Sequence, residues 1–407
     1  MYTPASSTSG TPLAQRLMTL GAELHQWRVF WSSHAFRDPV LAWESDSPEL
    51  SRALRGLDAP AVAALNADSS ARDAFLGRWF PVERWAGLEQ IGIAVGTALR
   101  PWPRDFDRDI PGRKWAQVKA FAGALASSSV SRTVDWCAGK AHLGRALACQ
   151  WQGSEVLALE RDPALVEAAL GLARRDGVRL DAQRCDVLSG DASAIVAGEV
   201  RVVALHACGA LHRRLFDVAS AAGTRALACA PCCFHLGEEG HRPRSAAGGR
   251  ANPGLAPEDL RTAVQEVVTS GAHDQRRREH VQSWQLGFDA LLREGLGHSA
   301  YTAVPGASAA LLGGGFASYC RHAARLKGLT LAADIDFPQW EARGRARFLE
   351  VSALDLVRQR FRRLIELWLV TDLAVSLEES GYAVRLERFC APALSPRNLL
   401  LQAERRA

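Results

Sequence analysis

Three acidic residues and one turn of small residues stand at a spacing that suits the binding of a nucleoside. Asp135 directly precedes the turn, Glu160 lies 21 residues after Gly139, and Asp186 follows a further apolar run. A carboxylate at Glu160 can accept hydrogen bonds from both ribose hydroxyls, and one at Asp186 can accept a hydrogen bond from an adenine amino group. An acid at Asp135 would repel a pyrophosphate but attract an amino group and a sulfonium. The pattern therefore favours S-adenosylmethionine over a dinucleotide.

The predicted cofactor contacts gather around this turn and the ends of the following apolar runs. They are Asp135, Cys137, Ala138, Gly139, His142, Leu143, Glu160, Arg161, Asp186, Val187 and His206. Taken alone, each acid has a plainer interpretation, because Glu160 can end a strand at the surface and Asp186 can cap a helix. His142 can likewise simply flank a helix. The three acids together at the required element ends favour the cofactor site.

A second set of reactive residues, all candidates for catalysis, lies in two short motifs. The first motif holds His206 and Cys208, and the second holds Cys232, Cys233 and His235. Three interpretations compete. The residues bind zinc, since thiolates and imidazoles are zinc ligands; or one of them is a catalytic thiol or base acting on a methyl acceptor; or they are small buried residues that shape a pocket floor.

The sequence argues against the zinc interpretation. Cys232 and Cys233 are adjacent, so in an extended strand their side chains point in opposite directions, and no further Cys-x₂-Cys pair lies elsewhere in the chain. We therefore predict no bound metal. His206 and His235 are expected at the acceptor pocket, where either can take up the proton that the acceptor loses.

The elements that must position these residues follow from an alternation of apolar runs. Strands are predicted at 131–136, 155–160, 178–185, 201–207, 224–230, 382–389 and 399–403, and helices at 143–151, 163–175, 211–222 and 361–380. Such alternation predicts a doubly wound α/β sheet, completed to seven strands by the terminal hairpin. Because ligands of open α/β sheets bind outside the carboxyl ends of the strands, the turn and the two motifs should share one crevice.

At these residues the sequence resembles class I S-adenosylmethionine-dependent methyltransferases. Their pattern is an acid, a Gly-x-Gly-x-Gly turn, an acid ending the second strand and Asp after the third, on a Rossmann-like seven-stranded sheet. Cys137 and Ala141 depart from this pattern, since glycine is usual at both positions. The resemblance covers about 113–235 and 360–407, and it implies that S-adenosylmethionine is the cofactor.

A narrower resemblance rests on three short motifs. They are His-Ala-Cys-Gly at 206–209, Pro-Cys-Cys-Phe-His at 231–235 and Ser-Pro-Arg-Asn-Leu at 395–399. They are similar to a subgroup that includes the methyltransferase-like domain of the glutathione S-transferase C-terminal domain-containing protein. More distantly, the subgroup includes tRNA acceptor-stem 2′-O-methyltransferases.

Four regions are expected along the chain. Residues 1–110 form an N-terminal helical, tryptophan-rich domain, 111–235 the cofactor half of the core, 236–360 a helical, basic insertion, and 361–407 the closing helix and hairpin. Six of the 12 tryptophans lie in the first region. They predict an aromatic core, with a stacking surface for RNA bases as the alternative.

The charge pattern bears on the substrate. The net charge is only +5, but residues 272–363 hold 14 lysine or arginine residues against 9 aspartate or glutamate residues. This excess, together with the tRNA-modifying relatives, favours RNA as the partner. A protein or small-molecule methyltransferase, a nicotinamide-dependent dehydrogenase and a non-catalytic cofactor-binding protein are the alternatives.

The remaining features concern location. The first ten residues lack the basic and apolar regions of a signal peptide, and seven of the nine cysteines fall between Cys137 and Cys233, unlike a disulfide framework. We expect a cytoplasmic protein that spans no membrane. Arginine outnumbers lysine 45 to 4, which is typical of a GC-rich bacterial genome. The sequence gives no indication of the oligomeric state.

Overall fold

The computed structural model describes residues 11–125, 130–151, 153–189, 192–237, 241–264, 272–304 and 306–406. The chain divides into two compact units, each built from separated stretches of sequence. The first, called the sheet unit below, comprises Met1–Gln26, Arg84–Glu266 and Arg362–Ala407. The second, called the helical unit, comprises Trp27–Glu83 and Val267–Phe361.

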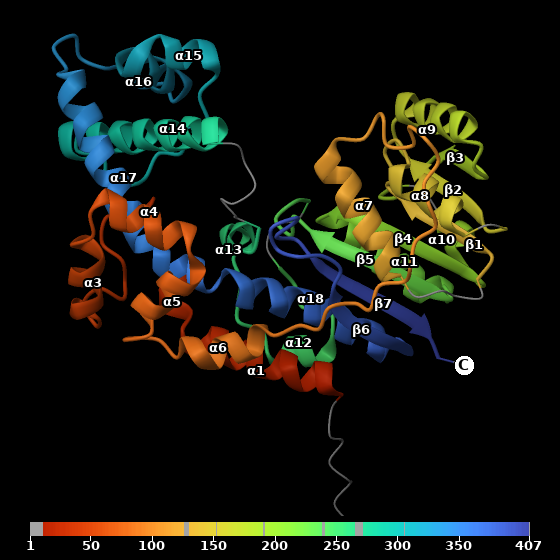
Figure 1. Cartoon of the computed structure of the whole chain (residues 1–407). Coiled ribbons are helices and arrows are strands. Elements are labelled where there is room, and N and C mark those ends of the chain that lie inside the picture. The colour runs from red at the N-terminus through yellow and green to blue at the C-terminus, as the bar shows by residue number, and fades with distance from the viewer. Residues whose placement is uncertain are drawn as a thin grey trace, which may run out of the picture. The chain divides into compact units, whose positions relative to one another are not determined.

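Seven strands of the sheet unit form one sheet in the described part of the chain (Figure 1). They are β1 (Arg132–Trp136), β2 (Glu155–Glu160), β3 (Leu180–Arg184), β4 (Val200–Cys208), β5 (Ala226–Cys232), β6 (Tyr382–Arg388) and β7 (Leu399–Arg405). Their order is β3-β2-β1-β4-β5-β7-β6. Strand β7 is antiparallel to β5 and β6, and the pairs among β1 to β5 are parallel. The predicted Rossmann-like sheet closed by a terminal hairpin is therefore confirmed.

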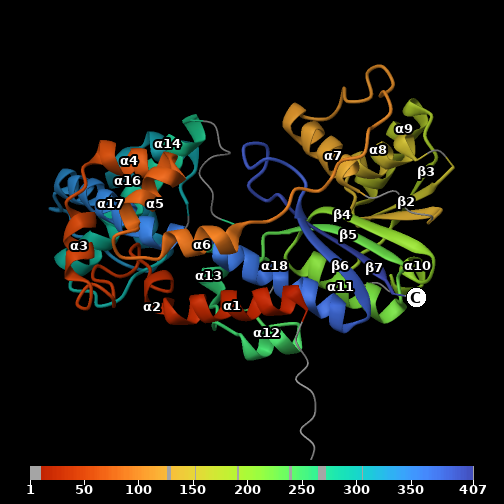
Figure 2. The same cartoon turned by 60° about the horizontal axis from the view of Figure 1, so that its bottom comes forward.

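Helices cover both faces of this sheet (Figure 2). They include α7 (Gly112–Ala124), α8 (His142–Gln150) and α9 (Pro163–Asp176) on one face, and α11 (Ala210–Ala222) and α18 (Arg362–Glu379) on the other. A buried cluster joins Phe121 of α7 and Leu147 of α8 to Val203 of β4. The hydroxyl of Tyr382 in β6 donates hydrogen bonds to the carbonyls of Ala219 and Thr224. The terminal hairpin is thus tied to the region around the end of α11.

Five further helices complete this unit in the described part of the chain. They are α1 (Pro12–Gln26), α6 (Val82–Glu89), α10 (Ser193–Val196), α12 (Ala246–Arg250) and α13 (Pro257–Thr262). Helix α6 begins at Val82, just before the sheet unit resumes at Arg84. The stretch 238–257 is polar and rich in glycine and proline, yet its described part, from 241 on, is fixed by Asp372 of α18. The two carboxylate oxygens of Asp372 accept hydrogen bonds from the backbone N–H groups of Arg244 and Ser245. This buried acid therefore holds α12 against α18.

The helical unit is built around one long helix. Its helices are α2 (Arg28–Trp31), α3 (Pro48–Arg55), α4 (Ala59–Ala67), α5 (Ser69–Leu76), α14 (Ala272–Ala290) with a π-helical turn η1 (Leu291–Gly295), α15 (Ala309–Gly313), α16 (Gly315–Leu326) and α17 (Phe337–Arg360). Helix α17 packs against α14 and also against α2 to α5. The core here includes Trp284, Phe288, Phe316, Tyr319 and Phe337. Among the described residues, no helix combines the length and apolar character that crossing a membrane requires.

The two units differ from the four regions expected along the chain. Residues 27–83 join the insertion rather than forming a domain with 1–26, because α2 to α5 bury their apolar faces against α17. Helix α1 packs against α18 of the sheet unit instead. A helical pattern shows that a segment has an apolar face, but it does not show which distant segment covers that face.

The N-terminal tryptophans serve mainly as core residues. Trp31, Trp43 and Trp85 are fully buried, and the indole N–H of Trp85 donates a hydrogen bond to buried Glu23 at 2.9 Å. Trp102 is half-buried and packs on the cluster between the sheet and its helices. These positions favour the aromatic-core interpretation over a surface for stacking RNA bases.

Candidate functional site

The predicted site residues meet at the carboxyl ends of the parallel strands, and the backbone there is strained. Five non-glycine residues in the described chain have positive φ, and four of them lie at this edge: Cys137, Ala141, His206 and Cys233. A left-handed conformation costs a non-glycine residue about 1–2 kcal/mol. Such strain persists where the surrounding structure compensates for it, and it gathers at functional sites.

The turn between β1 and α8 shows why glycines were expected there. Cys137, Gly139 and Ala141 have φ values of 55°, 58° and 52°, so all three positions of the family pattern need a left-handed backbone. The turn is tied to β2, because the N–H of Ala138 donates to the Leu159 carbonyl at 2.9 Å. Burial raises the pKa of the Cys137 thiol to about 12. The Cys137 thiol is therefore neutral, and the residue adopts the left-handed backbone that the turn requires.

Glu160 lies directly beside this turn. Its Oε2 accepts a hydrogen bond from the Gly139 N–H at 2.9 Å, and its Oε1 accepts from the N–H groups of Arg161 and Asp162 at 2.8 and 3.0 Å. The structure thus brings the strand-end acid to the glycine turn. No described heavy atom lies within 4 Å of where a Cβ would stand on Gly139, so a ligand has room to approach.

Asp135 is deeper than the sequence suggests. It is 3% exposed, and its Oδ2 accepts a hydrogen bond from the Gly144 N–H at 2.8 Å. Burial raises the pKa of Asp135 to about 7. A Cβ on Gly144 would stand 3.0 Å from this carboxylate, which explains the glycine. One oxygen of Asp135 therefore holds the first turn of α8.

The other predicted cofactor contacts, on α8 and after β2 and β3, differ in how far their side chains are buried. His142 and Leu143 are 4% and 5% exposed, and Val187 is 3% exposed, so their side chains point into the fold. Contact of these three residues with a ligand stays a prediction. Asp186 is half-buried and its Oδ1 accepts from the Leu188 N–H at 3.1 Å. Arg161 is exposed at the end of β2.

His206 at the end of β4 is held by a residue that the sequence did not indicate. The Nε2 of His206 lies 2.6 Å from Oε1 of Gln117 on α7. The amide nitrogen of Gln117 donates to the Leu394 carbonyl at 3.3 Å, so its oxygen must accept from His206 Nε2–H. Burial, together with the charge of Arg397, lowers the pKa of His206 to about 4. The ring is therefore neutral at pH 7, with Nδ1 as its acceptor.

The three predicted thiols meet at the ends of β4 and β5. The Sγ atoms of Cys208, Cys232 and Cys233 lie within 4.8 Å of one another. Strand β5 ends at Cys232, and Cys233 has φ 49°. The expectation that these adjacent side chains point in opposite directions is therefore wrong, because Cys233 has left the strand. His235 is half-buried, two residues further on.

Two positive charges missed by the sequence analysis act on this edge. Lys114, one turn before Gln117 on α7, favours the ionised form of Asp135. Arg397 favours the thiolate of Cys233, whose pKa is lowered chiefly by hydrogen bonds from the thiols of Cys208 and Cys232. Arg397 lies in the Ser-Pro-Arg-Asn-Leu motif, so the sequence could have indicated it as a site residue. Lys114 and Gln117 precede the sheet and lie outside the methyltransferase motifs, so the sequence gave no indication of them.

The comparison with known families covers this part of the chain. Residues 113–239 match a family model described as a methyltransferase domain. The strand order and this match give the sheet unit the fold of a class I methyltransferase. No curated protein matches the chain.

Solved structures resemble the chain only weakly. They include the Pyrococcus abyssi tRNA (uracil-54, C5)-methyltransferase with S-adenosyl-L-homocysteine, at 17% identity and a TM-score of 0.24, covering 29% of this chain and 28% of that one. An RNA methyltransferase from Salinibacter ruber with the same ligand has 14% identity and a TM-score of 0.25, covering 35% and 86%. A geranyl diphosphate methyltransferase with SAM has 16% identity and a TM-score of 0.26, covering 34% and 59%. The chain thus spans less than two thirds of the first and third of these proteins. The fold assignment rests on the strand order and the family match, not on these structures.

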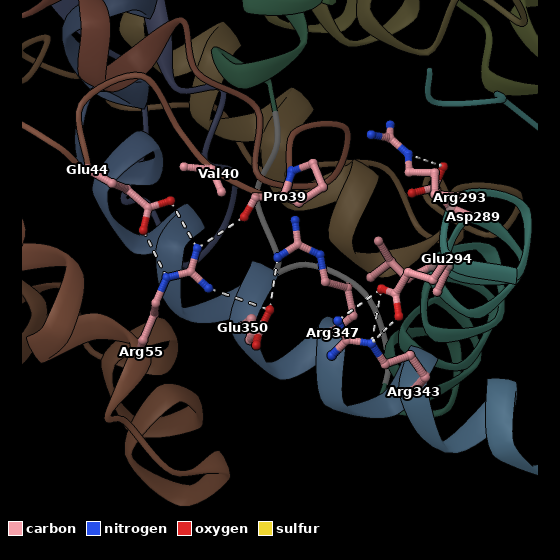
Figure 3. Close-up of a pocket in the computed structure, with 12 residues that line it drawn as sticks. Pro39, Val40, Glu44, Arg55, Asp289, Arg293, Glu294, Arg343, Arg347 and Glu350 are labelled. Carbon is pink, nitrogen blue, oxygen red and sulfur yellow. Dashed lines mark hydrogen bonds and ion pairs between the residues drawn. The ribbon is translucent and has the colours of Figure 1, made fainter. Parts of the chain in front are cut away.

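The helical unit contains a charged cavity of about 350 Å³, called the helical pocket below. Figure 3 shows its lining. Four arginines and four acids line it, and they pair with one another: Arg55 with Glu44 and Glu350, Arg293 with Asp289, Arg343 with Glu294, and Arg347 with Glu350. Because each of these charges has a partner inside the unit, the pocket is a structural ion-pair network.

Proposed function

We propose that the protein is an S-adenosylmethionine-dependent methyltransferase whose cofactor lies at the carboxyl ends of β1, β2 and β3. The turn 137–141 carries this proposal. It combines three left-handed positions, open space before Gly139 and a carboxylate of Glu160 hydrogen-bonded to the turn itself. A turn of this kind lets a ligand approach the backbone closely, which is what the glycine pattern achieves in nucleotide-binding sheets.

Three acids fit the parts of this cofactor. We expect Glu160 to accept hydrogen bonds from the ribose hydroxyls and Asp186 to accept one from the adenine amino group. Asp135 is buried, so it acts on a positive ligand through its field rather than by an exposed contact. A cationic ligand would restore its ionised form, because a nearby positive charge lowers a carboxyl pKa.

The residues at the ends of β4 and β5 would face the methyl acceptor. When bound, S-adenosylmethionine supplies an electrophilic methyl group on a sulfonium. Positioning supplies much of the catalysis in such a transfer. His206 is neutral at pH 7, and Gln117 fixes its Nε2 as the donor, which leaves Nδ1 to take the acceptor's proton. Gln117 is thus a positioning residue for His206.

RNA is the acceptor that we favour, within the subgroup that includes tRNA-modifying enzymes. Support comes from the excess of basic over acidic residues in 272–363. The structure weakens this support, because several of these arginines form ion pairs with acidic residues inside the helical unit. The exposed run Arg276, Arg277 and Arg278 on α14 is the strongest remaining basic feature. A small molecule or a protein is the alternative acceptor.

The test is transfer of a tritiated methyl group to fractionated extracts of cells that lack the protein. We expect label in RNA. Label only in protein or metabolites would support a methyltransferase with a substrate other than RNA. The absence of label from every fraction would support a non-catalytic cofactor-binding protein. Replacing Arg276, Arg277 and Arg278 together by alanine should lower transfer to RNA and weaken its salt dependence. Arg345→Ala is the control, because Arg345 is also exposed but is paired with Glu341 at 3.3 Å.

A further inference from the structure

We propose that Cys208, Cys232 and Cys233 bind one Zn²⁺ ion, with His235 as the fourth ligand. The site lies where β4 and β5 end, and it goes beyond the proposed methyl transfer, since it needs only these two strand ends. The sequence argument against zinc relied on Cys232 and Cys233 diverging, and the structure removes that premise.

The spacing of the sulfur atoms suits this ion. The three Sγ atoms lie within 4.8 Å of one another, and Cys208 Sγ is 3.6 Å from Cys232 Sγ. A tetrahedral zinc with Zn–S bonds of about 2.3 Å sets its thiolates about 3.8 Å apart. A disulfide requires sulfur atoms about 2.05 Å apart. All nine cysteines are free, and this trio is already close to the spacing that zinc requires.

The backbone at both strand ends departs from regular geometry so that the thiols converge. The pairing of β4 with β5 shifts register between Leu205 and Cys208, and His206 within this shift has φ 63°. Cys233 adopts φ 49° directly after β5. A bulge on one strand and a left-handed residue on the other are devices that re-aim side chains next to functional sites.

Backbone hydrogen bonds then hold this arrangement in place. The Gly209 N–H donates to the Cys232 carbonyl, and the Leu236 N–H donates to the Cys233 carbonyl, both at 3.0 Å. The Ala210 N–H donates to the Leu236 carbonyl at 3.0 Å. A Cβ on Gly209 would stand 2.0 Å from this same carbonyl oxygen. The thiols are therefore presented by a preformed frame, as a metal site requires.

The charges fit a zinc ion as well. Zn²⁺ binding displaces the protons of the three thiols. Three thiolates, one Zn²⁺ and a neutral histidine carry one net negative charge. Arg397 acts on Cys233 with one positive charge, so the complete site and this cation balance each other.

The ring nitrogens of His235 do not lie within 4.8 Å of all three Sγ atoms, so His235 must turn toward the ion to become the fourth ligand. It follows Cys233 by two residues. Its Nδ1 is buried, and within the described chain this atom has no hydrogen-bond partner. A buried imidazole nitrogen without a partner is costly, and metal coordination would satisfy it.

Metal analysis of the purified full-length protein after exhaustive dialysis tests the site. We expect about one zinc ion per chain. Cys233→Ser and Cys208→Ser should each lose most of it. Cys149→Ser, which removes a half-buried thiol of α8 outside the trio, should keep it. Cobalt-substituted protein should show thiolate-to-cobalt charge-transfer absorption, and Cys233→Ser should abolish that band. His235→Ala should weaken zinc retention against a chelator by at least the roughly 10–100-fold that loss of an outer-shell partner costs.

Three results would overturn the proposal. They are the absence of zinc with nine titratable thiols, a disulfide between two of the three cysteines, and full zinc content in Cys233→Ser. Titration of the same preparation with S-adenosylhomocysteine separates this proposal from the proposed function. Zinc content without S-adenosylhomocysteine binding would support the metal site and contradict the proposed function. S-adenosylhomocysteine binding without zinc would overturn the metal site and leave the proposed function standing.

Discussion

The sheet edge and the helical pocket both gather ionisable side chains, but they hold them differently. In the helical pocket Arg55 lies 2.8 Å from Glu44, and Arg343 lies 2.9 Å from Glu294 (Figure 3). Burial alone would raise the pKa of Glu44, yet hydrogen bonds from Arg55 and Ser51 lower it to about 2. These pairs stabilise the ionised forms that exist at neutral pH anyway.

At the sheet edge the environment opposes the ordinary charge states. Asp135 is buried and its pKa is raised to about 7, while that of His206 is lowered to about 4. The backbone around them is left-handed at residues that are not glycine. Perturbed titratable groups and local strain together are typical of functional sites, whereas a cavity lined by satisfied ion pairs is typical of structure. The comparison shows that pairing, rather than the presence of a cavity, distinguishes the two regions.

The largest effect is expected at His206. His206→Ala should lower kcat by roughly 100-fold or more, the range for losing a positioned base, and should leave the affinity for S-adenosylhomocysteine nearly unchanged. Single-turnover methyl transfer and calorimetry on the same preparation measure both quantities. Gln117→Leu should have a smaller effect on kcat with the same unchanged affinity. An unaltered kcat in His206→Ala would remove the histidine from the transfer step.

The next effect concerns the cofactor. Glu160→Ala should weaken S-adenosylmethionine binding by about 1.5–3 kcal/mol, the scale for hydrogen bonds to a charged group, and Asp186→Ala should cost less. Arg343→Ala in the helical pocket is the control and should leave binding unchanged. Isothermal titration calorimetry measures all three. Equal affinities in the wild type and Glu160→Ala would place the adenosine elsewhere.

The helical pocket should affect stability alone. Glu44→Gln should destabilise the helical unit by about 1–3 kcal/mol at pH 7, because the folded-state pKa of Glu44 is depressed. This contribution is present above the unfolded pKa of 4.5 and is lost as pH falls toward about 2. Hydrogen exchange in peptides from 27–83 and 272–361, followed between pH 7 and pH 3, measures it. A penalty that does not shrink with falling pH would show that the pair has another role.

The smallest effect is expected in the turn. Cys137→Gly should stabilise the sheet unit by about 0.5–1 kcal/mol, because glycine adopts φ 55° without strain. Ala138→Gly is the matched control, since position 138 is not left-handed, and it should destabilise the unit. Thermal unfolding compares the two variants. A destabilised Cys137→Gly would mean that contacts of the sulfur outweigh the backbone strain.

Local pattern predicted the sheet well. The strands around Glu160 and Cys232 end within two residues of where their apolar runs end, because a run of buried residues and its flanking turns are encoded in adjacent sequence. The convergence of the turn with both cysteine motifs also followed, since parallel strands share one edge. The packing of 27–83 against the insertion could not be predicted, because the local sequence of a helix does not show which distant segment packs on its apolar face.

Within the site, sequence reasoning failed where a single backbone angle decides direction. The prediction about Cys232 and Cys233 assumed a strand-like backbone at both, and the φ of 49° at Cys233 reverses the conclusion about the thiols. His142 and Leu143 were predicted as cofactor contacts because they follow the turn; both are buried at the start of α8, and their contact with a ligand stays a prediction. Gln117 was missed since it reaches His206 from 89 residues away in sequence.

Binding of S-adenosylmethionine at the turn 137–141 is tested by calorimetric titration of the full-length protein with S-adenosylhomocysteine and, separately, with NAD. We expect saturable binding of one S-adenosylhomocysteine per chain and no heat of binding with NAD. Saturable binding of NAD, or no binding of S-adenosylhomocysteine to a folded protein, would contradict this expectation.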